Sequence, residues 1–255
     1  MSKPLISLDI NCDMGESFGR YFLGNDEALM PWISSANIAC GFHGGDPSVM
    51  AKTVRLALSH GVSIGAHPGL PDLAGFGRRS MAVSPEEVES MVLYQMGALA
   101  AFTRAEGGEL HHVKAHGALY HMAGNDASVA AAIARAVHRF DAGLKLYVMA
   151  GSEMVAVGKK HGLSVVEEVF IDRRYRSGQA LVPRKEVGAV IDSEISAIGQ
   201  LQMLLDEGVV KTDRGQRCAI NAQTLCLHGD HPQSLRFAKK VFQCLEGQGI
   251  SVSTP

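Results

Sequence analysis

The sequence lacks the features that mark membrane, secreted and nucleic-acid-binding proteins. No stretch is apolar over the length needed to span a bilayer. Asp9 interrupts the short apolar run from Leu5 to Ile10, so the first residues do not resemble a signal peptide. The 24 basic and 26 acidic side chains nearly cancel, which leaves no general basic surface for nucleic acid or anionic lipid. We therefore expect neither a membrane nor a nucleic acid among the partners of this chain.

Cysteines are few and show no paired spacing. The sequence has five, an odd number, and no C-x-x-C motif. This pattern is typical of reduced thiols and not of a disulfide framework. Cys40 and Cys226 lie among apolar neighbours, and we interpret them as packing thiols, not nucleophiles. Together with the missing signal peptide, the cysteine pattern predicts a cytoplasmic protein.

Apolar residues follow two alternating periods along the whole chain. Short apolar runs indicate strands, and the segments between them show the periodicity of helices. No linker, charge run or internal repeat separates parts of the chain. With 255 residues, of which 46% are hydrophobic, this pattern predicts one α/β domain over residues 1–255, a distorted (β/α)7 barrel. We expect its strands at Ile6–Cys12, Ser34–Cys40, Val62–Ala66, Leu110–Ala115, Lys145–Met149, Val165–Ile171 and Gln223–Leu227.

Start and stop signals place the helices between these strands. Ser84 and Glu87 form a capping box, with Pro85 at the first helical position. Glycine follows the predicted end of most helices, as it commonly does at helix C-termini. The expected helices run from Asp46 to His60, from Ser84 to Gly107, from Asp126 to Phe140, from Ser152 to His161, from Glu186 to Gly208 and from Pro232 to Gly247.

Polar side chains gather where the predicted strands end. In a parallel α/β fold the functional site lies at the carboxyl ends of the strands. Asp9, Asn11 and Asp13 alternate with apolar residues in the first strand, so all three point into the barrel. A purely structural network is the simpler interpretation, but buried charges need partners, and we favour a functional site. Four other strands end in a histidine, namely His43, His67, His116 and His228.

These histidines raise the question of a metal. A lone histidine at a strand end is usually structural, whereas several that converge with Asp13 and Glu16 on one mouth are typical of an active site. The sequence has no H-E-x-x-H or other fixed ligand spacing, so a metal site and a metal-free site stay equally open. The first candidate ligands are Asp13, His43 and His67, a set that leaves positions open for water.

Two basic loops follow strand ends. One contains Arg79, the other begins with Asp172 and Arg173, and Arg184 follows downstream. The planar guanidinium group suits a carboxylate or a phosphate, and the helix N-terminus after Asp46 offers a further anion site. Solvated surface arginines are the alternative interpretation. If the arginines belong to the site, the substrate is anionic.

Several catalytic and nucleotide motifs can be dismissed. Gly61–Gly65 matches G-x-S-x-G, but Ser63 begins a predicted strand instead of occupying a turn between a strand and a helix. Gly151–Lys159 has the wrong spacing for a phosphate-binding loop, and no dinucleotide fingerprint follows the first strand. The chain therefore shows no nucleotide-binding motif of its own.

Six ordered segments carry a resemblance that spans essentially the whole chain. They are Asp9–Glu16, Asn37–Asp46, Gly65–Pro68, Lys114–Tyr120, Glu168–Tyr175 and His228–Asp230. With these motifs the chain resembles the LamB/YcsF family. The resemblance implies a barrel of the glycoside hydrolase/deacetylase type. It also implies ATP-dependent opening of the lactam of 5-oxo-L-proline to L-glutamate, together with two partners, 5-oxoprolinase subunits B and C.

The resemblance suggests roles for the polar residues. A lactam is a poor electrophile, and phosphorylation of its oxygen with ATP would make ring opening feasible. Asp13, alone or through a divalent metal, is expected to activate water. Lys114 and His116 are expected to stabilise the oxyanion or to protonate the leaving nitrogen. The residues expected to bind the substrate are Asn11, Glu16, Asn37, Arg79, Asp172, Arg173, Arg184, His228 and Asp230.

Two other functions stay open at this point. The implied barrel type and the Asp/His set also fit a metal-dependent, deacetylase-like hydrolase of carbohydrate that needs no ATP. A non-catalytic subunit that binds substrate and regulates its partners is the third hypothesis. It predicts that changes at the barrel mouth alter affinity but leave turnover by the partners intact.

Overall fold

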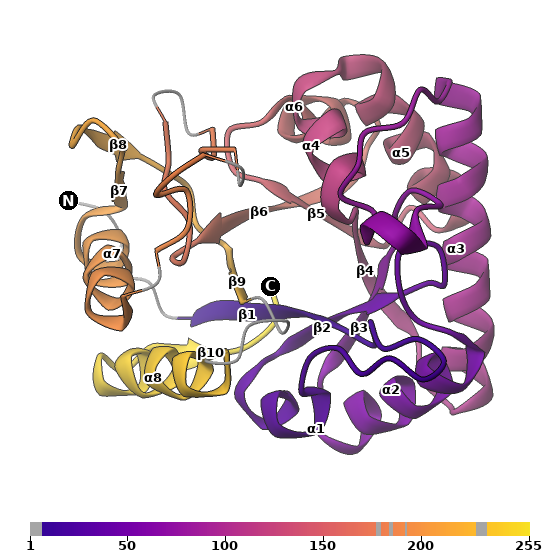
Figure 1. Ribbon diagram of the computed structural model, residues 1–255, viewed down its shortest axis with the longest axis horizontal. Helices are drawn as coiled ribbons and strands as arrows, with labels where there is room; N and C mark the ends of the chain where they lie inside the picture. Colours follow the sequence, from indigo (N-terminus) through magenta and orange to yellow (C-terminus); the bar gives the residue numbers. More distant parts are fainter. Residues whose placement is uncertain (1–6, 177–179, 184–185, 192, 228–233) are drawn as a thin grey trace.

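A computed structural model describes residues 7–176, 180–183, 186–191, 193–227 and 234–255 of the chain. Seven parallel strands pair in sequence, and the last of them pairs with the first, so the sheet closes into a barrel (Figure 1). The predicted distorted (β/α)7 barrel is confirmed, with every predicted strand boundary within two residues of the observed one. The strands are β1 (Ser7–Met14), β2 (Ser35–Ala39), β3 (Ser63–His67), β4 (Leu110–Lys114), β5 (Lys145–Met149), β6 (Ser164–Phe170) and β9 (Thr224–Leu227).

Strand β1 closes the barrel and sets its register. It pairs with β2 on one side, where Asp13 lies opposite Asn37, and with β9 on the other, where Asn11 lies opposite Cys226. A short further strand, β10 (Ser251–Val252), pairs with the first residues of β1. Because the strands of the barrel are parallel, their carboxyl ends meet at one mouth.

The alternation predicted for β1 is confirmed. Leu8, Ile10 and Cys12 belong to the apolar core, which β1 shares with the surrounding helices. Asp9 and Asn11 are also buried, but they make polar contacts with side chains of β2, β6 and β9. The barrel thus has an apolar outer layer and a polar interior.

Helices surround the barrel, with α3 along one side and α1 and α2 next to each other (Figure 1). Within the described ranges, no helix has the length and apolar character needed to cross a membrane. The helices are α1 (Asp26–Leu29), α2 (Pro47–Ser59), α3 (Pro85–Ala105), α4 (Gly117–Asn125), α5 (Ala127–Phe140), α6 (Glu153–Lys160), α7 (Glu194–Glu207) and α8 (Ser234–Gly247), with short 3-10 helices at Met30–Trp32 and Leu73–Gly75.

The predicted caps form at α2 and α3. The side chain of Ser84 accepts a hydrogen bond from the backbone of Glu87, and the Glu87 side chain accepts one from the backbone of Ser84. At α2 the carboxylate of Asp46 accepts hydrogen bonds from the backbone of Ser48 and Val49. These local signals were readable because the capping partners lie within three residues of each other.

The helix predicted to start at Glu186 is wrong over its first turns, because α7 begins at Glu194. Gly188 has a left-handed φ of 77°, and Val190 forms an antiparallel bridge with Arg173. These contacts hold residues 186–191 against the loop that follows β6. The predicted end at Gly208 is confirmed, since that glycine caps α7 in the left-handed conformation.

Besides α1 and β10, three short elements, namely α4, β7 (Val209–Lys211) and β8 (Arg217–Ala219), are absent from the prediction. Helix α4 starts directly after the residues of β4, and its first turn is held by a hydrogen bond from Ala118 N to Gly77 O at 2.8 Å. The strands β7 and β8 form an antiparallel hairpin beside α7. All three elements are short, so their apolar periodicity is too brief to identify.

Candidate active site

Lys114, at the end of β4, lies inside the barrel with only 3% of its surface exposed. Its Nζ atom is 3.1 Å from Asp13 Oδ1 and 2.8 Å from Glu168 Oε1. It also contacts Asn11 Oδ1 and Cys226 Sγ, each at 3.1 Å. Burial alone would lower the pKa of this amine, but Asp13, Cys226 and Glu168 raise it well above its usual value. The group is therefore an ammonium ion held between two carboxylates.

Glu168 is the second carboxylate that holds the Lys114 ammonium group in place. Its Oε1 atom accepts a hydrogen bond from Asn11 Nδ2 at 2.8 Å, and its Oε2 atom accepts one from the Tyr120 hydroxyl at 2.6 Å. Burial, and then the charge of Glu168, raises the pKa of Tyr120, so this hydroxyl stays a donor. The sequence reasoning missed both residues as members of the site. Glu168, a carboxylate inside a strand with apolar residues on both sides of the pair Glu167 and Glu168, was the available signal.

Asn11 and Asn37, which we expected to bind substrate, lie fully buried at the floor of this network. Asn37 Nδ2 donates to Asn11 Oδ1 at 2.7 Å and to Asp13 Oδ1 at 2.9 Å. His112, on β4, contacts Asn37 Oδ1 through its Nε2 atom at 2.8 Å. Because a carbonyl oxygen only accepts, that nitrogen is the donor. Both amides are thus used to orient Asp13 and Lys114.

A second group of side chains lies next to Asp13. Among the described residues, one ligand atom from each of Glu16, His43, His67 and His116 falls within 4.8 Å of the others. His116 Nδ1 is 3.0 Å from His67 Nε2, and His43 Nε2 is 3.3 Å from Glu16 Oε1. Asp13 joins this histidine cluster from outside, with Oδ2 3.3 Å from His67 Nε2. Of the four strand-end histidines expected to converge, His43, His67 and His116 do so, and His228 lies outside the described residues.

Backbone groups orient the rings of the histidine cluster. His67 Nδ1 lies 2.7 Å from the carbonyl oxygen of Lys114, and His116 Nε2 lies 2.9 Å from that of Phe76. The rings of His43 and His116 stack with their centroids 3.6 Å apart. A Cβ atom at Gly77 would come within 2.9 Å of both stacked residues, so only glycine lets this loop close over them.

Burial keeps the stacked imidazoles neutral. It is the main cause of a pKa well below the usual value for His43, and the neighbouring His116 and His67 add to the effect. Burial, and then His67, lowers the pKa of His116 to about 3. At neutral pH both rings therefore offer a lone pair, which is the form that accepts protons and binds metals.

The predicted anion-binding residues lie in different settings. Arg79 is largely exposed and pairs with the carboxylate of Asp72. Arg173 is buried and donates to the backbone oxygen of Val182 at 2.7 Å. Asp172 is half-buried, at the start of the same loop. Three further predicted residues, namely Arg184, His228 and Asp230, lie outside the described residues.

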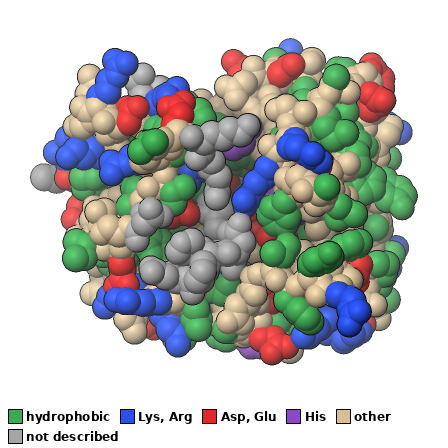
Figure 2. Space-filling view, in the orientation of Figure 1, with side chains coloured by type: hydrophobic (Ala, Val, Ile, Leu, Met, Phe, Trp, Pro, Cys, Tyr) green, Lys and Arg blue, Asp and Glu red, His purple; other side chains and the backbone are tan. Residues whose placement is uncertain are grey.

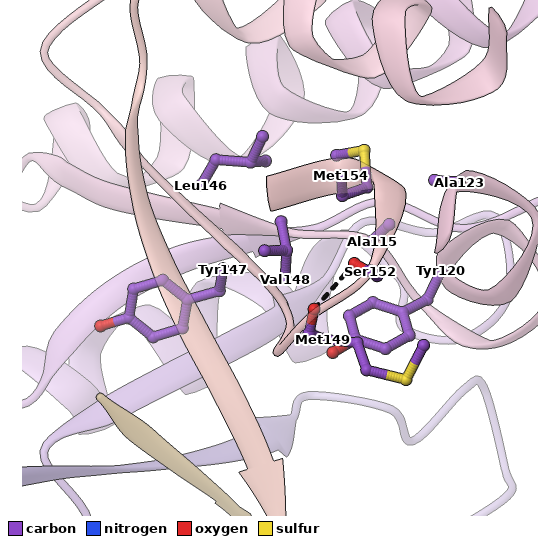
Figure 3. Close-up of a pocket in the computed structure, with 9 residues that line it drawn as sticks. All are labelled: Ala115, Tyr120, Ala123, Leu146, Tyr147, Val148, Met149, Ser152 and Met154. Atoms are coloured by element: carbon purple, nitrogen blue, oxygen red, sulfur yellow. Dashed lines mark hydrogen bonds between the residues drawn. The ribbon is translucent and has the colours of Figure 1, made fainter. Parts of the chain in front are cut away.

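The surface around this end of the barrel is hollowed. Figure 2 shows a depression between the part of the chain that carries α7, β7 and β8 and the part that carries α4 and α6, with basic side chains on both flanks. A separate small cavity lies between α4 and β5, lined by Tyr120, Tyr147 and Met149 among others (Figure 3). Its volume of about 10 Å³ is enough for one water molecule at most, so it is not a substrate pocket.

Known proteins resemble the chain over nearly its full length. The A component of 5-oxoprolinase from Geobacillus kaustophilus (strain HTA426) is 53% identical over 249 residues, which cover 98% of this chain and 97% of the relative. The crystal structure of the lactam utilization protein from Thermus thermophilus has 47% identity and a TM-score of 0.93, and the match covers 98% and 100% of the two chains.

More distant structures share the fold. A T48 deacetylase, solved with substrate, is 13% identical, with a TM-score of 0.50 over 98% of this chain and 88% of that chain. At this identity the likeness concerns the fold alone, and it confirms the expected deacetylase type of barrel. The sequence profile of the LamB/YcsF family matches residues 8–255. With the curated relative at 53% identity and the near-identical fold of the Thermus protein, this match shows that the chain belongs to the LamB/YcsF family.

Proposed function

We propose that this chain is the lactam-opening component of an ATP-dependent 5-oxoprolinase. It would hydrolyse 5-oxo-L-proline to L-glutamate together with the partner subunits B and C. The name and the high identity of the Geobacillus relative support the substrate class. The observation that carries the chemistry is the Lys114 ammonium, buried between Asp13 and Glu168 beside the histidine cluster.

The arrangement supplies the groups that amide hydrolysis needs. An ammonium ion in a water-poor site stabilises the negative charge that develops on a carbonyl oxygen. Asp13, on the exposed side of Lys114, is the carboxylate placed to accept a proton from an attacking water. Both groups are held by the asparagine network, so neither has to reorganise during the reaction. We therefore assign charge stabilisation to Lys114 and the role of general base to Asp13.

Protonation of the leaving nitrogen falls to Lys114 in this proposal. The pKa of His116 is lowered to about 3 by burial and then by His67, so at neutral pH its ring holds no spare proton. Its Nε2 hydrogen points to the carbonyl oxygen of Phe76. Lys114 keeps its proton and lies within reach of the same space. His116 then serves as a proton acceptor or as a metal ligand.

ATP enters the proposal through the partner subunits. The helix N-terminus after Asp46, expected to bind an anion, is filled by its own residue: the Asp46 carboxylate accepts hydrogen bonds from Gly19, Ser48 and Val49. The residues there do not fit a phosphate group, and we route no step of this chain through the nucleotide. Use of ATP is also the reason to propose a cytoplasmic location.

The test is glutamate formation from 5-oxoproline by the purified chain, with and without subunits B and C, and with and without ATP. We expect glutamate only when all three chains and ATP are present. The Asp13→Asn chain in the same mixture should form glutamate at least about 100-fold more slowly. If correctly folded partners and ATP yield no glutamate with the unaltered chain, the proposal is wrong.

The histidine cluster favours one second candidate, a metal-dependent hydrolase of acetylated carbohydrate. Release of acetate from acetylated sugars by the isolated chain, without ATP or partners, would support it over lactam opening. If the chain is instead a non-catalytic binding subunit, Asp13→Asn should weaken 5-oxoproline binding but leave glutamate formation by the partners intact.

A further inference from the structure

Two ring nitrogens of the histidine cluster face each other at short distance. The carbonyl oxygens of Lys114 and Phe76 only accept hydrogen bonds, so His67 Nδ1 and His116 Nε2 carry ring hydrogens that point away from the cluster. The inward nitrogens, His67 Nε2 and His116 Nδ1, are 3.0 Å apart. A cation placed beside them could use both nitrogens as ligands.

The other members of the cluster add donors to the same place. Glu16 Oε1 is 3.6 Å from His116 Nδ1 and 3.3 Å from His43 Nε2. The remaining ring nitrogen of His43 is buried and has no hydrogen-bond partner among the described residues. That nitrogen, Nδ1, lies beside Gly69 and does not face Glu16. The donor atoms that converge on one place are therefore Glu16 Oε1, His43 Nε2, His67 Nε2 and His116 Nδ1.

We propose that Glu16, His43, His67 and His116 bind one divalent transition-metal ion, with Zn²⁺ as the ion that suits them best. Imidazole nitrogens and a carboxylate oxygen are usual zinc ligands, whereas Mg²⁺ and Ca²⁺ prefer sets composed of oxygen. The outward hydrogen bonds of His67 and His116 to backbone carbonyls are the kind that orient metal-binding histidines.

The charge around the cluster agrees with a divalent cation. Three carboxylates, those of Asp13, Glu16 and Glu168, lie close together, and the ammonium group of Lys114 contacts only Asp13 and Glu168 of the three. A divalent ion at the cluster would offset the carboxylate charge that Lys114 does not reach, since uncompensated buried charge is costly.

This ligand set differs from the one expected from the sequence. Asp13 turns Oδ1 toward Lys114 and Asn37 and places Oδ2 3.3 Å from His67 Nε2. It therefore lies beside the proposed ion, where it keeps its place as a base. Glu16 and His116 become ligands instead of groups that bind substrate or transfer protons.

The experiment measures metal on the full-length chain, independently of turnover. The purified chain is freed of metal with a chelator, titrated with Zn²⁺, and analysed by elemental analysis after gel filtration. We expect one equivalent of zinc per chain, and we expect the chain to retain it in the presence of a competing chelator at micromolar concentration. At a free Zn²⁺ concentration 100 times the dissociation constant, the midpoint of thermal unfolding should rise by about 5–10 °C. An unaltered chain that retains no zinc and shows no shift overturns the proposal.

Variants locate the ion. His67→Asn and Glu16→Gln should each weaken zinc binding by at least about 10–100-fold, the loss that even an indirect partner of a metal site produces. The matched control is His111→Asn, which removes a half-buried histidine that contacts another histidine outside the cluster. Equal loss in the control, or unchanged binding in both cluster variants, shows that zinc binds elsewhere and overturns the assignment.

The proposed metal site lies at the same end of the barrel as the residues of the proposed function, but either proposal can be disproved without the other. Stoichiometric zinc without glutamate formation by the complete mixture would remove the lactam assignment and leave the metal site. Glutamate formation by a chain that binds no zinc would remove the metal site and leave the lactam assignment. Cobalt(II) in place of zinc provides a second readout in the unaltered chain, because its visible absorption reports the number of ligands directly.

Discussion

The two ends of the barrel interior treat their polar groups differently. Near the amino end of β1, the hydroxyls of Ser34, Ser35 and Thr224 donate to the Asp9 carboxyl group at 2.5–2.8 Å. Ser35 also lies 3.2 Å from the hydroxyl of Tyr147. Each of these donors has an acceptor within the chain. This end is a closed network whose contribution is to stability.

At the carboxyl end of the barrel, not every buried polar atom has a hydrogen-bond partner among the described residues. His43 Nδ1 has no partner within the described part of the chain, and the ring nitrogens of His67 and His116 face each other at 3.0 Å. A buried polar atom without a partner costs free energy. The polar groups at this end are therefore less fully satisfied than those around Asp9, and the contrast can be tested one residue at a time.

The largest effect is expected for Asp13→Asn. Loss of the carboxylate removes the proposed base but keeps the shape of the side chain and the ion pair of Lys114 with Glu168. Glutamate formation in the complete mixture should fall by about 10²–10⁴-fold, with little change in the denaturant midpoint. Near-normal turnover would remove Asp13 from the chemistry.

Gly77→Ala should damage the open end more than an equivalent change elsewhere. A Cβ atom at Gly77 would lie 2.7 Å from His43 Cβ, and the residue has a φ of 61°. Gly61→Ala is the control, because φ is 66° there and no atom lies within 4 Å of the added carbon.

Urea unfolding measures this difference. Backbone strain alone should cost the Gly61 variant about 1–2 kcal/mol, and overpacking should cost the Gly77 variant about 1–3 kcal/mol more. Equal losses in the two variants would show that the loop yields and that the rings are not tightly held.

Tyr120→Phe should cause a smaller loss, because it removes one donor from a buried carboxylate. The hydroxyl bonds Glu168 Oε2 at 2.6 Å, and hydrogen bonds to charged groups contribute about 1.5–3 kcal/mol. Tyr94→Phe, at an exposed position of α3, should leave the free energy of unfolding unchanged. Chemical denaturation of both variants tests this, and matching stabilities would mean that water replaces the lost donor.

The smallest effect is a change in pH dependence at the closed end. Burial, opposed by the hydrogen bonds from Ser34, Thr224 and Ser35, raises the pKa of Asp9 above its usual 3.8. The folded chain therefore holds this proton more tightly than the unfolded chain. Its contribution to the free energy of unfolding falls as pH rises from 3.8 to the folded-state pKa and is then constant.

Asp9→Asn removes this titration. The stability of the unaltered chain relative to the variant should decline with pH over that window, measured by urea unfolding at successive pH values. A difference that stays constant across the window would mean that Asp9 titrates alike in both states.

Local patterns made much of this molecule predictable. The alternation of Asp9, Asn11 and Asp13 with apolar residues gave both the strand and its inward face, and the capping box at Ser84 gave the start of α3. Such signals depend on residues a few positions apart. The start of α7 was missed because tertiary contacts of the loop after β6, including the bridge to Val190, override the local helical pattern.

The site was predictable only in part. Strand ends in a parallel barrel must converge, so the meeting of His43, His67 and His116 followed from the fold. The pairing of Asn11 with Glu168 joins residues 157 positions apart, and no local pattern reports such a contact. Which of the converged polar groups bond to each other depends on the register of the strands and on the length of the side chains.

The alternation in β1 has a consequence for how this chain can vary. Asp9, Asn11 and Asp13 form a ladder that runs from the closed network to the open one, with Leu8, Ile10 and Cys12 on the opposite face. Deleting or inserting a single residue within this ladder would exchange the two faces at once. Substitutions in β1 can be compensated one by one, but a change of length cannot, so we expect the chain to tolerate an insertion or deletion only in the loops outside this strand.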